Sequence, residues 1–163
     1  MKRALLFLTT LLLSQSVLAQ SQYAKPADAN SLPGVYQLIE FPDANQPKFL
    51  KSNPWPANCQ FFGIYKNGYL LHQETRVGSC SNQIPRAIPV TAQGVEWKFV
   101  QTGILSIARK DGKGVTQYWK VDKVIANTHL DKINLNSGDL MMQLIGPEKK
   151  PVWLRLLKKV GDA

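Results

Sequence analysis

Residues 59–80, CQFFGIYKNGYLLHQETRVGSC, contain two apolar runs separated by Lys-Asn-Gly. An Asn-Gly pair between strand-like runs predicts a β-hairpin, because a two-residue type I′ turn needs positive φ at both central positions and Asn and Gly tolerate that best. With Asn67 and Gly68 as the turn, Ile64 is expected to lie opposite Leu71. This hairpin is the strongest structural signal in the chain.

The rest of the chain carries short strand-like runs, which Gly, Pro, Asn and Asp separate at intervals of about ten residues. Val95, Trp97 and Phe99 alternate with charged residues, which is typical of a half-buried strand. Trp119 and Val121 belong to a second run with the same period. No amphipathic helix is indicated. We expect an all-β protein of about eight to ten strands, whose mostly sequential connections favour an antiparallel up-and-down meander closed into a barrel.

The two ends of the predicted barrel region carry one short motif each. The first strand opens Gly-Val-Tyr at Tyr36, and the last strand carries Arg155 in Trp-Leu-Arg-Leu. These motifs resemble the calycin plan of bacterial lipocalin-like proteins, in which a Gly-x-Trp on the first strand meets an arginine of the final strand across the closed end of an eight-stranded barrel. The resemblance implies that Tyr36 takes the tryptophan position and that Arg155 covers it, as a structural pair worth about 1–2 kcal/mol.

The N-terminus follows the three-part plan of a secretory signal peptide. A basic start precedes a short apolar run and a polar stretch that ends Val-Leu-Ala at Ala19. We expect export to the periplasm or the medium, with cleavage after Ala19 and no transmembrane segment in the mature chain. The predicted organisation is a signal peptide (1–19), a flexible lead-in (20–33) and one barrel domain (34–160).

Charge and cysteine content fit an exported protein. The whole chain carries a net charge of +9, and the signal peptide holds two of the 20 basic residues and none of the 11 acidic ones, which leaves about +7 for the mature form. The basic residues are scattered, so nucleic-acid binding is not expected. The two cysteines, Cys59 and Cys80, flank the open end of the hairpin, where Cys59 is expected opposite Arg76. One disulfide is the simplest interpretation, with two free thiols as the alternative.

No set of residues in the sequence predicts a reaction. His72 and Glu74 share one face of a strand and would need a third group, such as His129 or Asp131, to hold a metal ion, so we interpret them as ordinary strand residues. No nucleophile motif or metalloprotease motif occurs. Asp-Gly-Lys-Gly at 111–114 is interpreted as a hairpin turn, because no strand–loop–helix setting surrounds it. We therefore predict no catalytic residue, no metal and no cofactor.

A barrel of this size is either filled by its own side chains or holds one small ligand, and the sequence leaves both open. The large residues predicted to line the interior are Tyr36, Trp97, Phe99, Trp119 and Met142. Trp55, from the proline-rich segment 42–58, is predicted to cap the opening and to contribute to ligand binding. The segment 42–58 is expected either to pack on the core or to cover the opening as a lid.

Two functions are therefore expected for a protein that is not an enzyme. The first is binding of a small apolar or amphipathic ligand inside the barrel. The alternative is a filled barrel that inhibits or docks onto an acidic envelope protein or anionic lipid through a basic surface. The residues predicted for that surface are Arg76, Arg86, Arg109, Lys149, Lys150, Lys158 and Lys159.

Overall fold

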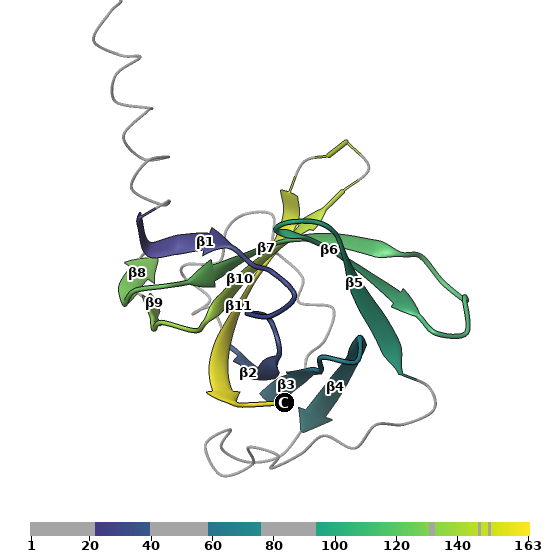
Figure 1. Cartoon of the computed structure of the whole chain (residues 1–163), viewed down its shortest axis with the longest axis horizontal. Helices are drawn as coiled ribbons and strands as arrows, with labels where there is room; N and C mark the ends of the chain where they lie inside the picture. Colours follow the sequence, from purple (N-terminus) through teal and green to yellow (C-terminus); the bar gives the residue numbers. More distant parts are fainter. Residues whose placement is uncertain (1–21, 40–58, 76–93, 131–132, 147, 150) are drawn as a thin grey trace, which may run out of the picture.

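The computed structural model describes residues 22–39, 59–75, 94–130, 133–146, 148–149 and 151–163 (Figure 1). The predicted signal peptide and the segment 42–58 lie outside these residues. Among the predicted site residues, Trp55, Arg76, Cys80, Arg86, Asp131 and Lys150 also lie outside them.

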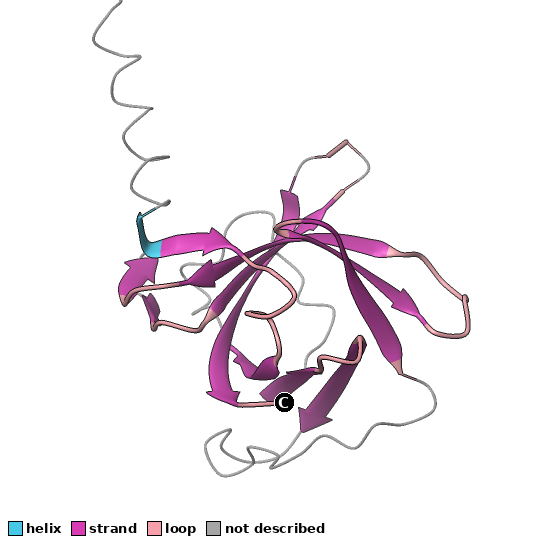
Figure 2. Ribbon diagram, in the orientation of Figure 1, coloured by secondary structure: helices cyan, strands magenta, loops and turns pink. Residues whose placement is uncertain are grey.

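Almost every described segment is a β-strand, as Figure 2 shows. Eight strands form the wall, in chain order: β2 (Gly34–Leu38), β3 (Cys59–Ile64), β4 (Tyr69–Thr75), β5 (Val95–Gln101), β6 (Ile104–Arg109), β7 (Gln117–Val124), β10 (Leu140–Ile145) and β11 (Pro151–Gly161). Each strand pairs antiparallel with its neighbour, β7 pairs with β10, and β11 returns to β2. The chain is therefore a closed, antiparallel eight-stranded barrel with up-and-down order, which confirms the predicted fold class.

The predicted alternation of side chains fixes the inner face of the barrel. On β5, Trp97 is buried and Val95 and Phe99 are partly buried, whereas Glu96 and Lys98 are exposed. β7 follows the same pattern, with Trp119 and Val121 fully buried. Because side chains of a strand point alternately to its two faces, the inward positions of β5 and β7 give their bulky apolar residues to the main core.

The β3–β4 hairpin lies where the sequence predicts it, but its register differs by one residue. Ile64 pairs with Leu70 rather than with Leu71, and only Gly68 of the turn has positive φ (87°). The amide of Gly68 donates to the Tyr65 carbonyl at 3.0 Å, and the Tyr65 amide donates to the Tyr69 carbonyl at 2.9 Å. This is a three-residue loop that ends in a left-handed glycine, a common alternative to the two-residue turn.

The shift in register decides which side chains enter the barrel. Ile64 and Leu70 belong to the main core, whereas Leu71 packs with Phe61 in a separate cluster. The same shift places Cys59 opposite Thr75 rather than Arg76. Because Cys80 lies outside the described residues, the disulfide stays a prediction.

The segment before β2 covers one end of the barrel. β1 (Ala24–Pro26) extends the wall by pairing with β7, and Ala27 and Leu32 are fully buried. Between them, the Asp28 carboxylate accepts hydrogen bonds from the backbone amides of Asn30 and Ser31 at 3.0 and 2.8 Å, which holds a tight turn. Part of the segment 20–33, which composition alone assigns to a flexible lead-in, therefore packs against the barrel.

Gly103, in the turn between β5 and β6, holds this cover in place. Its amide donates to the Ala27 carbonyl at 3.0 Å, and its carbonyl accepts from the Val121 amide at 2.8 Å. Its φ is +74°, and a Cβ added there would lie 2.8 Å from the Cβ of Pro26. A side chain at this position is therefore disfavoured both by the backbone and by its neighbour.

We expect Gly103→Ala to lower the free energy of unfolding by about 2–3 kcal/mol, the sum of left-handed strain of roughly 1–2 kcal/mol and the displacement of Pro26. Urea denaturation measures the change. Gly112→Ala is the matched control, because Gly112 also has positive φ (69°) but nothing lies within 4 Å of its added Cβ. Equal losses in the two variants would show that the contact with Pro26 contributes nothing.

A two-stranded ribbon lies outside the barrel wall. β8 (Thr128–Leu130) pairs with β9 (Ile133–Leu135) in the connection between β7 and β10, beside β1 in Figure 1. Ile133 and Leu135 pack with Leu156 of β11 and with Val124 at the end of β7. The ribbon therefore covers apolar side chains on the outer face of the wall.

Candidate functional site

The core does not fill the whole barrel. Tyr36, Leu105 and Leu140 pack with the buried side chains of the N-terminal cover at one end. Toward the β6–β7 loop a cavity of about 270 Å³ remains. Among the described residues, nine apolar ones line it: Phe62, Ile64, Leu70, Val95, Ile107, Ala108, Val115, Met142 and Leu157.

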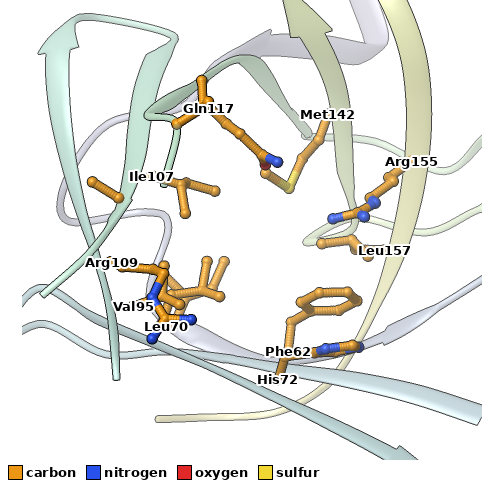
Figure 3. A pocket seen from close by; sticks show the side chains of 13 residues that line it. Phe62, Leu70, His72, Val95, Ile107, Arg109, Gln117, Met142, Arg155 and Leu157 are labelled. Carbon is orange, nitrogen blue, oxygen red and sulfur yellow. The ribbon is translucent and has the colours of Figure 1, made fainter. Parts of the chain in front are cut away.

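Four polar side chains complete the described lining: His72, Arg109, Gln117 and Arg155. Figure 3 shows Arg155 reaching into the cavity from β11, across from Ile107, with Gln117 and Met142 on one side and Phe62 and His72 on the other. No Asp or Glu is among the described residues that line the cavity. The lining is thus apolar with a positive bias.

Arg155 is held against two aromatic rings. Its guanidinium carbon lies 4.8 Å from the ring centroid of Trp119 and 5.5 Å from that of Phe62. Burial lowers the pKa of Arg155 to about 10, so the group is still a cation at neutral pH. The two ring faces partly replace the water that the charge has lost.

Trp119 and Gln117 form the wall beside Arg155. Trp119 is completely buried, and its indole Nε1 donates to the Gln117 Oε1 at 3.1 Å. The indole therefore has its polar atom satisfied while its ring face remains available to the guanidinium.

His72 lies across the β3–β4 ladder from Phe62. The two rings stack with their centroids 4.7 Å apart and their planes at 16°, and the imidazole Nε2 is 3.3 Å from the Gln60 Oε1. His72 therefore adds a polar group that is fixed by its neighbours.

The β6–β7 loop forms part of the cavity rim. Arg109 makes a two-pronged ion pair with Asp111, at 3.1 Å from Nε and 2.7 Å from a terminal nitrogen. Val115, which also lines the cavity, is 89% exposed. The rim thus combines a neutralised arginine with an apolar residue that faces solvent.

The residues predicted to bind a ligand separate into three groups. Met142 lines the cavity, and Trp119 lies behind Arg155. Trp97 is buried in the core, and Phe99 packs against that core. The Trp97 Nε1 donates to the carbonyls of Tyr65 and Tyr69 in the β3–β4 hairpin. Trp55 lies outside the described residues.

The structure gives Tyr36 and Arg155 different neighbours from those that the resemblance implies. Tyr36 of β2 lies opposite Lys159, four positions along β11 from Arg155, and its hydroxyl donates to the Leu32 carbonyl at 2.7 Å. Four strand residues span roughly 13 Å. The described rings that contact the Arg155 guanidinium are those of Trp119 and Phe62, and Arg155 lines the cavity.

Tyr36 yields a pH prediction. Burial, and secondarily the negative charges of Asp139 and Asp162, raise the pKa of Tyr36 well above its ordinary value of 10. The folded protein therefore keeps this proton at a pH where the unfolded chain loses it. The stabilisation is fully present below pH 10 and is lost as the pH rises further, by up to about 1.4 kcal/mol per pH unit.

Tyr36→Phe should be about 1 kcal/mol less stable at pH 7, because the Leu32 carbonyl loses its donor. Above pH 10 the two proteins should converge, since phenylalanine has no proton to lose. Denaturation curves of both proteins at a series of alkaline pH values measure this. Parallel stability profiles would contradict the effect of burial on Tyr36.

The other sequence candidates are the predicted non-ligands of a metal ion and the predicted basic surface, of which Arg76, Arg86 and Lys150 lie outside the described residues. His129 lies on the outer ribbon opposite Asn134, and no group of three described His, Cys, Asp or Glu residues could hold a metal ion. Of the described basic residues, Arg109 is paired with Asp111 and Lys159 with Asp162. Lys149 and Lys158 are exposed.

Gln117, Arg109 and Arg155 line the cavity but were not predicted as ligand-binding residues. The available signal was the phase of alternation, because Gln117 lies two residues from Trp119 and Arg155 two residues from Leu157. A polar residue in the inward phase of a barrel strand is costly unless it has a partner or a role.

The part of the chain that the structure describes contains no helix with the length and hydropathy needed to cross a membrane. In comparisons with known proteins, no family model, no curated protein and no solved structure matches this chain.

Proposed function

We propose that the barrel is a binding protein for a small, mostly apolar molecule with one polar end. The cavity carries this proposal. It has a volume of about 270 Å³ and opens to solvent at its rim. The volume lies just below the common range of ligand sites, which points to a small ligand rather than a long lipid chain.

The composition of the lining also supports binding. Of the thirteen lining residues that the structure describes, nine are apolar and four are polar. Sites for small molecules combine an apolar surface, which supplies affinity, with a few placed polar groups, which fix orientation. We include in the proposal that the protein is exported and of lipocalin-like type. The signal-like N-terminus and the up-and-down order of the eight-stranded wall support those two points.

Titration of the full protein with the neutral apolar fluorophore N-phenylnaphthylamine tests the proposal. We expect a saturable rise in fluorescence. Native mass spectrometry of the protein, purified from the cell envelope of its source organism, should detect a bound small molecule. Val95→Phe should weaken probe binding roughly tenfold or more, because the ring fills space that the probe needs.

Val100→Phe is the matched control. Val100 lies on the same strand, is 52% exposed and is not among the lining residues, so probe affinity should not change. Absence of saturable binding, or equal binding by wild type and Val95→Phe, would contradict a ligand site in the cavity.

A further inference from the structure

We infer that Gln117 selects the polar end of the ligand: its side-chain amino group donates a hydrogen bond to a neutral carbonyl oxygen, as in a ketone or an ester. The inference rests on the proposed function and names the chemical class of the molecule that the cavity takes. It follows from the hydrogen bond that fixes the Gln117 carboxamide, from the donors of the lining and from the place of Gln117 near the rim.

The first observation is that the orientation of the Gln117 carboxamide is fixed. An indole N–H can only donate, so the atom that the Trp119 Nε1 contacts at 3.1 Å is the carbonyl oxygen of Gln117. Trp119 has no exposed surface and lies two positions along the same strand, so this bond holds the oxygen against the wall. The Nε2 amino group is then the branch of the carboxamide that points away from Trp119.

The second observation is that this amino group belongs to the cavity lining. Gln117 lines the cavity, and Figure 3 shows its side chain reaching inward beside Met142. Among the residues that the structure describes, the hydrogen-bond partner of this side chain is the Trp119 indole, which engages the carbonyl. A carboxamide nitrogen carries two N–H donors, and an apolar ligand that covers them without an acceptor removes their hydration at a cost. A ligand with an acceptor oxygen avoids that cost.

The third observation is that the described lining offers donors rather than acceptors. It contains no Asp or Glu, and the guanidinium groups of Arg109 and Arg155 donate and never accept, whatever partners they hold. A ligand amine or alcohol brings a donor that needs an acceptor, whereas a carbonyl oxygen only accepts. A carboxylate brings a charge that the neutral Gln117 does not compensate in an apolar space. A neutral carbonyl group therefore fits best.

The fourth observation is the place of Gln117 along the wall. It is the first residue of β7 and follows the β6–β7 loop, whose Val115 lines the cavity and is 89% exposed. Met142 lies opposite Val121, four positions further along β7. A ligand whose carbonyl oxygen binds Gln117 therefore has its polar end toward the rim and its apolar body in the deeper part of the cavity.

Two ligands with one skeleton test the inference. Acetophenone carries a ketone where ethylbenzene carries a methylene group, and each is titrated as a competitor of N-phenylnaphthylamine on the full protein. Gln117→Met keeps the length of the side chain and removes the amide. It should weaken acetophenone binding roughly 5- to 20-fold and change ethylbenzene binding by less than about twofold. Because each free ligand is hydrated equally in both titrations, the difference between the proteins reports the contact inside the cavity.

Two further variants separate this contact from the support that Gln117 gives to Trp119. Gln117→Glu keeps an oxygen for the indole but removes the amino group, so acetophenone should again weaken roughly 5- to 20-fold relative to ethylbenzene. Gln101→Met is the matched control, because Gln101 is exposed on β5 and is not among the described lining residues. Both affinities should stay within about twofold there. Circular dichroism establishes that the variants are folded.

Infrared spectroscopy gives a readout that a change in packing alone would not reproduce. A hydrogen bond weakens the C=O bond, so the carbonyl stretch of bound, isotope-labelled acetophenone should lie at lower frequency in the wild type than in Gln117→Met. Equal frequencies, or a Gln117→Met protein that keeps the wild-type ratio of the two affinities, would show that the assignment to Gln117 is wrong while apolar binding stands. If the fluorophore and both ligands fail to bind the wild type, both proposals fall.

Discussion

Replacing Trp119 with alanine should lower the free energy of unfolding by about 3–5 kcal/mol, the largest effect that we expect of a single substitution. Trp119 has no exposed surface, packs in the main core, and bonds through its indole to Gln117. Its removal leaves a void that a closed barrel wall cannot collapse to fill, and it also takes away one of the two rings that support Arg155. Guanidinium denaturation followed by circular dichroism gives the value.

Two further variants isolate the cause. Tyr118→Ala removes an aromatic ring from the preceding position of the same strand, where it is 46% exposed, and should change stability by about 0.5 kcal/mol or less. Trp119→Phe keeps most of the volume and should recover much of the loss. Similar losses for Trp119→Ala and Tyr118→Ala would contradict the inward orientation of Trp119.

The second large effect concerns Asp139, which joins the start of β10 to the end of β11. Its side chain is 2% exposed, and its two oxygens accept hydrogen bonds from the backbone amides of Asn136 at 2.8 Å and Lys159 at 2.9 Å. Asp139→Ala leaves both amides without their acceptor at a partly buried site. We expect a loss of about 3 kcal/mol, since hydrogen bonds to charged groups contribute about 1.5–3 kcal/mol each.

Asp162→Ala is the control for charge. Asp162 pairs with the ammonium group of the same Lys159, but its side chain is 91% exposed, so its removal should have little effect on the denaturation midpoint. If both aspartates had the same small effect, the hydrogen bonds of Asp139 to the backbone would not contribute to barrel closure.

The wall of the barrel could be predicted from alternation, because strands such as β5 and β7 have one buried and one largely exposed face. The register of the β3–β4 hairpin could not, since Lys-Asn-Gly suits both a two-residue turn and a three-residue loop with a left-handed glycine. The choice is made by packing. Pairing Ile64 with Leu70 puts both residues in the main core, and local turn chemistry contains no information about that core.

The cavity was harder to predict than the wall. The inward orientation of Trp119 and Met142 could be predicted from alternation. Whether the large side chains fill the barrel depends also on the position of each one along the barrel axis, which alternation does not give. Arg155 shows the same limit, because its motif suggests a contact with Tyr36 and only the strand register reveals that the two residues lie at different heights.

The N-terminal cover shows why composition alone is a weak guide to flexibility. Residues 20–33 are rich in Ala, Ser, Asn and Pro, yet the hydrogen bonds of Gly103 and Val121 fix Ala27 in place. These bonds join residues that are about 75 to 95 positions apart in the chain. Hydrogen bonds between residues so far apart cannot be predicted from a local sequence pattern.

The pairing of β2 with β11 has a consequence for how the protein folds. These are the first and last strands of the wall, and Tyr36 meets Lys159 across 123 positions of sequence. Such distant pairing makes the search for the native state slow, on a timescale of milliseconds to seconds. Because the chain emerges with its N-terminus first, β11 is the last strand of the wall to appear, and the barrel cannot close before then. Until then β2 exposes a free edge, and the nascent protein needs protection from aggregation for almost the whole of its synthesis.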